Sequence, residues 1–205
     1  MYRIEELRVK ELMEKIAQPV FPGPASGSAV AVGAAMGASL LEMSWRATLK
    51  KDPQTPNGDA NLERMKSGGE TLLELATKDM EGYNVYVKSA SLKKTDPAAY
   101  DEALLTGTTP LVDIAMESLA LLELLDQVQP DCFVKVQGDL AGSGTLLHGA
   151  VQAAVVATRI NLGLMVYGDY PGKVGKQLAE AEEKASRFYE KIMNRVKGML
   201  PDRRK

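Results

Sequence analysis

The sequence predicts an all-α fold, a single domain over residues 1–205 that forms a bundle of about seven helices. Three observations support this prediction. Apolar residues recur at helical spacing along most of the chain, no segment alternates like a strand, and two long segments rich in Gly, Ala and Ser carry almost no charge. Helices that are apolar or small in every direction belong at the centre of a bundle. The chain is long enough to bury such a core.

The N-terminal half contains three predicted helices. The first ends before Pro19 and Pro22, and apolar residues at helical spacing define it: Ile4, Leu7, Leu12, Met13 and Ile16. The second, over 29–41, is the first uncharged segment, and we expect it to be central and largely buried. The segment 52–59, with two prolines and an Asn-Gly pair, forms a loop, and a third helix follows over 60–92.

The C-terminal half contains the remaining helices. A short helix begins at Pro97 and is expected to break at Gly107, with Thr109 and Pro110 as the cap and first-turn residue of a helix over 111–128. The linker that follows holds the one obvious strand-like run. Two long helices, over 139–167 and 171–199, complete the bundle, and the part over 146–162 is the second central segment.

Charge and composition exclude several functions. The 27 acidic and 25 basic residues give a net charge of −2, so no overall field favours nucleic acid. Cys132 is the single cysteine, which excludes an internal disulfide framework. The charged N-terminus lacks the apolar region of a secretory signal, and Glu42 and Arg46 closely follow the first uncharged segment. We therefore expect a cytoplasmic protein that binds neither nucleic acid nor membrane.

The sixth predicted helix carries two distinct faces. At about 100° per residue, one face is small with polar groups at both ends, and it comprises Asp139, Ser143, Ala150, Ala154, Ala157 and Asn161. The second is a polar seam of Thr145, His148, Gln152 and Arg159. Such faces permit close helix packing, or contact with a partner subunit, in which polar groups satisfy each other. The alternative is a slot for a flat ligand.

Four segments in chain order point to a family. They are "PASGSAVAVGAAMGASLLEM" from Pro24, "TKDMEGYNVY" from Thr77, "TTPLVDIA" from Thr108 and "GDLAGSGTLLHGAVQAAVVATRINLG" from Gly138. Together they resemble the cyclodeaminase domain of formiminotransferase-cyclodeaminase and its stand-alone bacterial relatives, which include methenyltetrahydrofolate cyclohydrolases. The resemblance implies an all-helical, homodimeric, folate-binding protein.

The sequence also departs from the family pattern. The family motif Pro-Gly-Gly-Gly-Ser reads Pro-Ala-Ser-Gly-Ser here, because Ala25 and Ser26 replace two glycines. Gly138 stands where the family has Ser before Asp139, and Ala157 stands where it has Asn. Activity is therefore a separate question from fold.

The resemblance implies a reaction and a set of site residues. The substrate would be 5-formiminotetrahydrofolate, converted to 5,10-methenyltetrahydrofolate and ammonia, or the methenyl compound would be hydrolysed. A carboxylate suits both pterin N–H donors and proton transfer, so Asp139 is the first catalytic candidate and Asp79 the second. The substrate-binding candidates are Ser26, Gly27, Ser28 and Asn161. The alternative is a helical dimer that binds folate without catalysis.

Each candidate has a structural alternative. Asp139 is equally suited to cap a helix, Asp79 to face solvent, and Asn161 to satisfy a buried backbone group. Asp139 and Asn161 are about 22 residues apart, roughly 33 Å along one straight helix, so one ring cannot touch both. Either Asp139 lies in a loop close to Ser28, or the two residues serve different ends of an extended folate or different subunits. We favour the loop, because Gly138, Gly142 and Gly144 disfavour a continuous helix from Asp139.

No cofactor beyond a tetrahydrofolate substrate is expected, and no metal. The single histidine, His148, has no Cys or His partners at the spacing of a zinc site.

Overall fold

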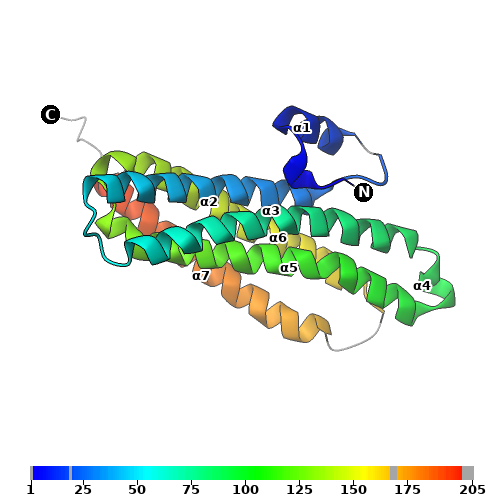
Figure 1. Ribbon diagram of the computed structural model, residues 1–205. Coiled ribbons are helices and arrows are strands. Elements are labelled where there is room, and N and C mark those ends of the chain that lie inside the picture. The colour runs from blue at the N-terminus through cyan, green and yellow to red at the C-terminus, as the bar shows by residue number, and fades with distance from the viewer. Residues whose placement is uncertain (1, 19, 167–169, 200–205) are drawn as a thin grey trace.

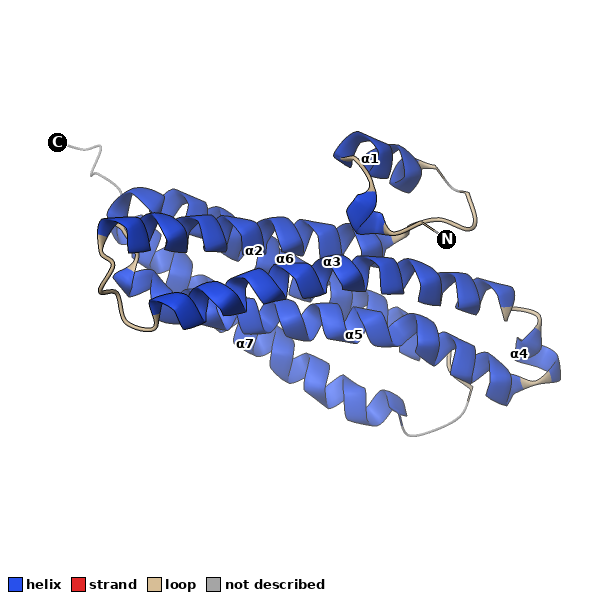
Figure 2. Cartoon of the chain, in the orientation of Figure 1, coloured by secondary structure: helices blue, strands red, loops and turns tan. Residues whose placement is uncertain are grey.

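The computed structural model of the chain describes residues 2–18, 20–166 and 170–199 (Figure 1). These residues are mostly helical and contain no strand (Figure 2), which confirms the all-α prediction. Their seven α-helices are α1 (Val9–Ala17), α2 (Ser26–Lys51), α3 (Gly58–Lys88), α4 (Leu92–Thr95), α5 (Pro97–Val128), α6 (Gln137–Leu162) and α7 (Tyr170–Met199). Three short 3-10 helices join them: η1 (Ile4–Glu6), η2 (Gln129–Asp131) and η3 (Val134–Val136). Helix α6 ends at Leu162, earlier than predicted, and the predicted end itself, Tyr167, lies outside the described residues.

The long helices lie side by side and make an elongated bundle (Figure 1). α2, α3, α5 and α6 form a closed ring in which α2 and α5 each pack against both α3 and α6, while α7 packs on α5 and α6. The fully buried Trp45 joins two of these helices, because its indole N–H donates to the Gly58 carbonyl at 2.8 Å. The end of α2 is thereby fixed to the start of α3.

The two uncharged segments lie in neighbouring helices, α2 and α6. The Ser143 hydroxyl of α6 donates to the Gly37 carbonyl of α2 at 2.7 Å, and a Cβ at Gly37 would lie 3.1 Å from the Cβ of Leu146. Glycine thus lets the two helices approach closely. The expected burial is only partly right, since Met36 is 47% and Val156 52% exposed on the outer side. Each helix has one face in the core and one face open.

By length and composition alone, α2 and the segment Val134–Leu162 could each span a membrane. Core helices of soluble bundles satisfy the same criterion. Both segments belong to the closed helical ring, where each packs against two other helices. Packing within the bundle therefore explains the apolar residues on the faces that these helices turn toward their neighbours.

α5 is continuous, so the predicted break at Gly107 is wrong. Pro110 lies inside the helix, where it lacks the N–H that would bond the Thr106 carbonyl. At this point α3 packs very closely on α5: a Cβ at Gly82 would lie 2.6 Å from the Thr106 oxygen and 3.0 Å from the Cα of Gly107. Packing between the two helices therefore supports α5 through its proline.

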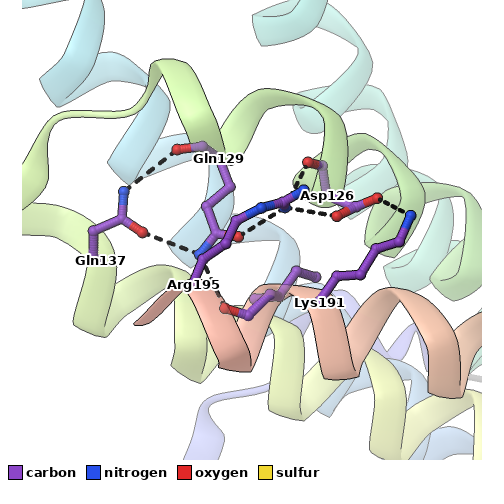
Figure 3. Close-up of polar contacts among 6 residues, drawn as sticks. Asp126, Gln129, Gln137, Lys191 and Arg195 are labelled. Carbon is purple, nitrogen blue, oxygen red and sulfur yellow. Dashed lines mark hydrogen bonds and ion pairs between the residues drawn. The ribbon is translucent and has the colours of Figure 1, made fainter. Parts of the chain in front are cut away.

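The linker between α5 and α6 forms the 3-10 helices η2 and η3 and not a strand. Figure 3 shows the buried polar network that holds it. The Gln129 amide is fully buried and donates to Gln137 at 3.0 Å. Arg195 of α7 donates to the Asp126 carboxylate at 2.6 Å and to the Gln129 side chain at 3.1 Å. The last part of α7 is thereby tied to the ends of α5 and α6.

The polar seam of α6 faces α7. The His148 ring stacks on the ring of Tyr189, with centroids 4.5 Å apart and an interplanar angle of 3°. Arg159 pairs with Glu182 at 2.8 Å. These groups thus find partners within the chain, which favours the packing interpretation of the seam over contact with a partner subunit.

Candidate active site

A small pocket lies where the first turn of α2 meets the last turns of α6. Its volume is about 170 Å³. Four helices contribute to its lining, which consists of Ala25, Ser26, Gly27, Asp79, Tyr83, Gly107, Leu111, Ala157, Ile160 and Asn161. Segments far apart in the sequence therefore build one site.

Asp79 is the buried charged group of this pocket. It is 4% exposed, and its carboxylate accepts a hydrogen bond from the Ser28 hydroxyl at 2.8 Å and another from the Ser28 backbone N–H. Helix α2 has no side-chain cap of its own at Ala25. Asp79 of α3 thus serves as the cap of α2, at the helix end where backbone N–H groups favour a negative charge.

The pKa of Asp79 is raised from 3.8 to about 6. Burial raises it, because the ionised form loses hydration, and the two hydrogen bonds from Ser28 limit the rise by stabilising that form. A carboxyl group with this pKa is present in both forms close to neutral pH. It can therefore accept and return a proton during a reaction.

Gly27 is the glycine that this geometry requires. A Cβ at this position would lie 2.1 Å from Oδ1 of Asp79 and 2.5 Å from Cδ2 of Leu111. Ala25 is half-buried before the helix and Ser26 is exposed, so both positions accept a side chain. The one glycine retained in the Pro-Ala-Ser-Gly-Ser segment is thus the one that contacts the carboxylate.

α6 supplies the opposite wall of the pocket from its last turns. Asn161 is half-buried and presents an amide that can both donate and accept. Ala157 lies one turn earlier and Ile160 is 62% exposed at the outer edge. The wall therefore combines one polar group with small and apolar surface, as suits the edge and face of a flat ring.

Five of the six site residues predicted from the sequence lie together. Asp79, Ser26, Gly27 and Asn161 line the pocket, and the fully buried Ser28 lies behind it, bonded to Asp79. Ser28 therefore acts on the carboxylate and does not itself line the pocket.

Asp139 is the residue that the structure leaves apart. The expectation that it lies in a loop close to Ser28 is wrong, because α6 begins at Gln137 and is continuous to Leu162. Its glycines do not interrupt the helix: Gly144 packs on Ile192 of α7, and Ser143 bonds to α2. Asp139 is thus in the first turn of α6, while the pocket lies at the last turns. Its catalytic role stays a prediction.

The site residues predicted from the sequence did not include several lining residues, although two of them, Tyr83 and Leu111, lie in the segments that resemble the family. Tyr83 follows Asp79 by four residues, so both lie on the same face of α3. This spacing can be read from the sequence and indicates that Tyr83 lies close to Asp79. Gly107 and Leu111 come from α5 and have no such local signal, because only the packing of α5 on α3 brings them to the pocket.

A larger cavity, of about 450 Å³, lies between the N-terminal segment and the α2–α3 groove. Its lining is largely apolar, and its three carboxylates already have partners. Glu5 accepts from Thr77 at 2.7 Å and pairs with Arg3, Glu42 pairs with Arg46, and Glu70 pairs with Lys66. Among the described residues, no group of three or more His, Cys, Asp and Glu side chains is placed to hold a metal ion. The smaller pocket therefore remains the stronger candidate.

The fold and the pocket define an all-α bundle protein with a buried carboxyl group of raised pKa in its pocket. The sequence model of the family described as formiminotransferase-cyclodeaminase matches residues 8–181, and the chain belongs to this family. Among solved structures, the crystal structure of formiminotetrahydrofolate cyclodeaminase from Thermotoga maritima is similar in fold, with a TM-score of 0.89 and 24% identity over 96% of this chain and 98% of that chain. A comparison with curated proteins finds no match.

Proposed function

We propose that the chain is a folate one-carbon enzyme, which converts 5-formiminotetrahydrofolate to 5,10-methenyltetrahydrofolate and ammonia. The observation that carries the proposal is Asp79, a buried carboxyl group with a pKa of about 6 in a pocket shared with Asn161. Family membership supplies the substrate class, and the solved relative is described as a formiminotetrahydrofolate cyclodeaminase.

The reaction needs one proton to move between two nitrogens. N10 of the substrate attacks the formimino carbon, which forms a C–N bond and leaves a positive charge on N10. The Asp79 carboxylate accepts the N10 proton and returns it to the amino group, whose bond to carbon then breaks as ammonia leaves. The methenyl cation keeps the charge of the protonated formimino group, so no net proton is consumed.

The other groups of the pocket position the substrate. The Asn161 amide matches the donor and acceptor edge of a pterin, and the N–H groups at the first turn of α2 add donors. Ser28 fixes the orientation of the Asp79 carboxylate through its 2.8 Å hydrogen bond. A tetrahydrofolate derivative is the only small molecule that this mechanism requires.

The test follows methenyl absorbance after purified protein is mixed with 5-formiminotetrahydrofolate. We expect turnover by the wild type and a loss of at least about 100-fold in Asp79→Asn, which keeps the shape but removes the proton acceptor. Asp113→Asn is the matched control, since Asp113 lies on α5 outside the pocket. Asp139→Asn, measured alongside, decides between the two catalytic predictions.

The other functions correspond to other outcomes of the same experiment. Loss of methenyl absorbance from added 5,10-methenyltetrahydrofolate indicates a cyclohydrolase. Folate binding without either conversion indicates a non-catalytic binding protein. Full activity in Asp79→Asn contradicts the assignment of Asp79.

A further inference from the structure

Two aromatic side chains of this protein are exposed without an evident structural reason. Phe21 is 42% and Tyr83 39% exposed, and the other aromatic residues described are half-buried or buried. Single exposed apolar residues are ordinary in soluble proteins. These two, however, contact each other, with ring centroids 6.5 Å apart and an interplanar angle of 75°.

The pair lies at the candidate active site. Tyr83 lines the pocket beside Asp79, and Phe21 is in the segment that leads into Ala25, which is also a lining residue. In an edge-to-face arrangement the two rings expose different surfaces, an edge of one and a face of the other, and both surfaces attract a further aromatic ring.

Tyr83 is the first in a row of three neighbouring tyrosine rings. Its ring centroid lies 6.5 Å from that of Tyr86, which in turn lies 6.0 Å from that of the buried Tyr100. Neighbouring rings limit the rotation of the Tyr83 ring before any ligand arrives, and an ordered ring loses less entropy on binding.

The size of the pocket indicates what the exposed rings contact. Sites that enclose a whole drug-sized ligand have volumes of about 300–1,000 Å³. This pocket, of about 170 Å³, is below that range, so a folate can place only its pterin end inside it. The next part of a folate is the flat p-aminobenzoyl ring, which then lies at the mouth of the pocket.

We propose that Phe21 and Tyr83 form a binding subsite for the p-aminobenzoyl ring of the folate. The proposal rests on the proposed function and extends it to a part of the ligand that the reaction does not change. Phe21 contributes affinity for intact folate only, because it does not line the pocket. Tyr83 contributes to both parts of the ligand.

Calorimetry with two stable ligands tests the subsite. The ligands are 5-formyltetrahydrofolate and the corresponding 5-formyltetrahydropterin, which lacks the p-aminobenzoylglutamate. For Phe21→Leu we expect folate affinity to fall about tenfold, equivalent to about 1.4 kcal/mol, and pterin affinity to stay unchanged. Phe21→Tyr, which keeps the ring, should bind folate within about twofold of the wild type.

The control is Phe133→Leu, because Phe133 lies in the linker before α6, away from the pocket. Thermal melting verifies that each variant is folded. If Phe21→Leu binds folate like the wild type, or loses pterin and folate affinity equally, the subsite is overturned and the proposed function stands. If the wild type binds neither ligand, the proposed function is overturned together with the subsite.

Discussion

Asp79 links the packing of the helices to the chemistry of the pocket. Its carboxylate accepts two hydrogen bonds from Ser28, so it completes the first turn of α2 from a neighbouring helix. Burial destabilises the ionised form of Asp79, and for the same reason it raises the pKa of this carboxyl group toward neutrality. The same residue therefore destabilises the fold at neutral pH and gives the pocket a carboxyl group that titrates close to neutrality.

This residue makes stability depend on pH in a defined direction. The folded-state pKa, about 6, is above the unfolded value of about 3.8, so the folded state binds the proton more tightly. The stability gained from this protonation is present below about pH 4 and is lost as pH rises through about 6. At about 1.4 kcal/mol per pKa unit, the difference amounts to roughly 3 kcal/mol.

Asp79→Asn should therefore stabilise the protein at about pH 8 and change its stability little at about pH 4. Urea unfolding at the two pH values measures the difference, with Asp139→Asn as the control. An equal effect of Asp79→Asn at both pH values would contradict a raised pKa.

At the scale of helices, the sequence predicted most of the elements. Helical spacing located the long helices because each buries an apolar face, and the loop before α3 followed from its Pro and Asn-Gly signals. The break at Gly107 was wrong, since it depended on local signals while packing against Gly82 determines the helix. Where two helices are in contact, their packing outweighs the intrinsic helix propensity of the residues involved.

The network around Gln129 leads to a prediction for the α5–α6 linker. Arg195→Met keeps much of the apolar side chain but removes the donor to the buried Gln129 side chain and one of the two cations of Asp126, which keeps its 3.6 Å ion pair with Lys191. We expect the free energy of unfolding to fall by about 1–3 kcal/mol, mainly because the buried Gln129 side chain loses a donor. Arg159→Met, which removes the more exposed pair with Glu182, should cost at most about 1 kcal/mol. Chemical denaturation compares the two, and equal losses would contradict the prediction.

At the scale of the whole molecule, the open face of α2 and α6 remains unexplained by the monomer. No Asp, Glu, Lys or Arg occurs from Ser26 to Leu41 or from Leu140 to Thr158. Large apolar side chains are exposed there, and an added Cβ at Gly33 or Gly149 would meet no atom within 4 Å. Glycine inside a helix costs about 1 kcal/mol relative to Ala, and no contact among the described residues requires it at these two positions.

We therefore retain the prediction of a two-fold homodimer and assign it to this face. Light scattering at micromolar concentration should give twice the monomer mass for the wild type. Val156→Asp places a charge on the face and should give a folded monomer. Val134→Asp, at an exposed position in η3, should stay dimeric. A wild-type monomer would overturn the prediction.

The site was less predictable than the fold. Asp79 and Asn161 were candidates from the family resemblance, but the sequence could not decide between Asp79 and Asp139. That decision depends on which helix ends meet, and Ser28 is 51 residues from its partner Asp79. Tyr83 could have been inferred from its spacing to Asp79, whereas Leu111 reaches the pocket only through helix packing.

The contact between Gly27 and Asp79 has an evolutionary consequence. Since a Cβ at position 27 would overlap the carboxylate, the two positions are not free to change independently. Alanine at 27 would need both a smaller residue at 79 and a shift of the Leu111 side chain, so a descendant that kept Asp79 could not accept it. Positions 25 and 26 carry side chains in this chain, and position 27 does not. Among relatives, the residue at position 27 should therefore record whether a lineage still uses its carboxylate.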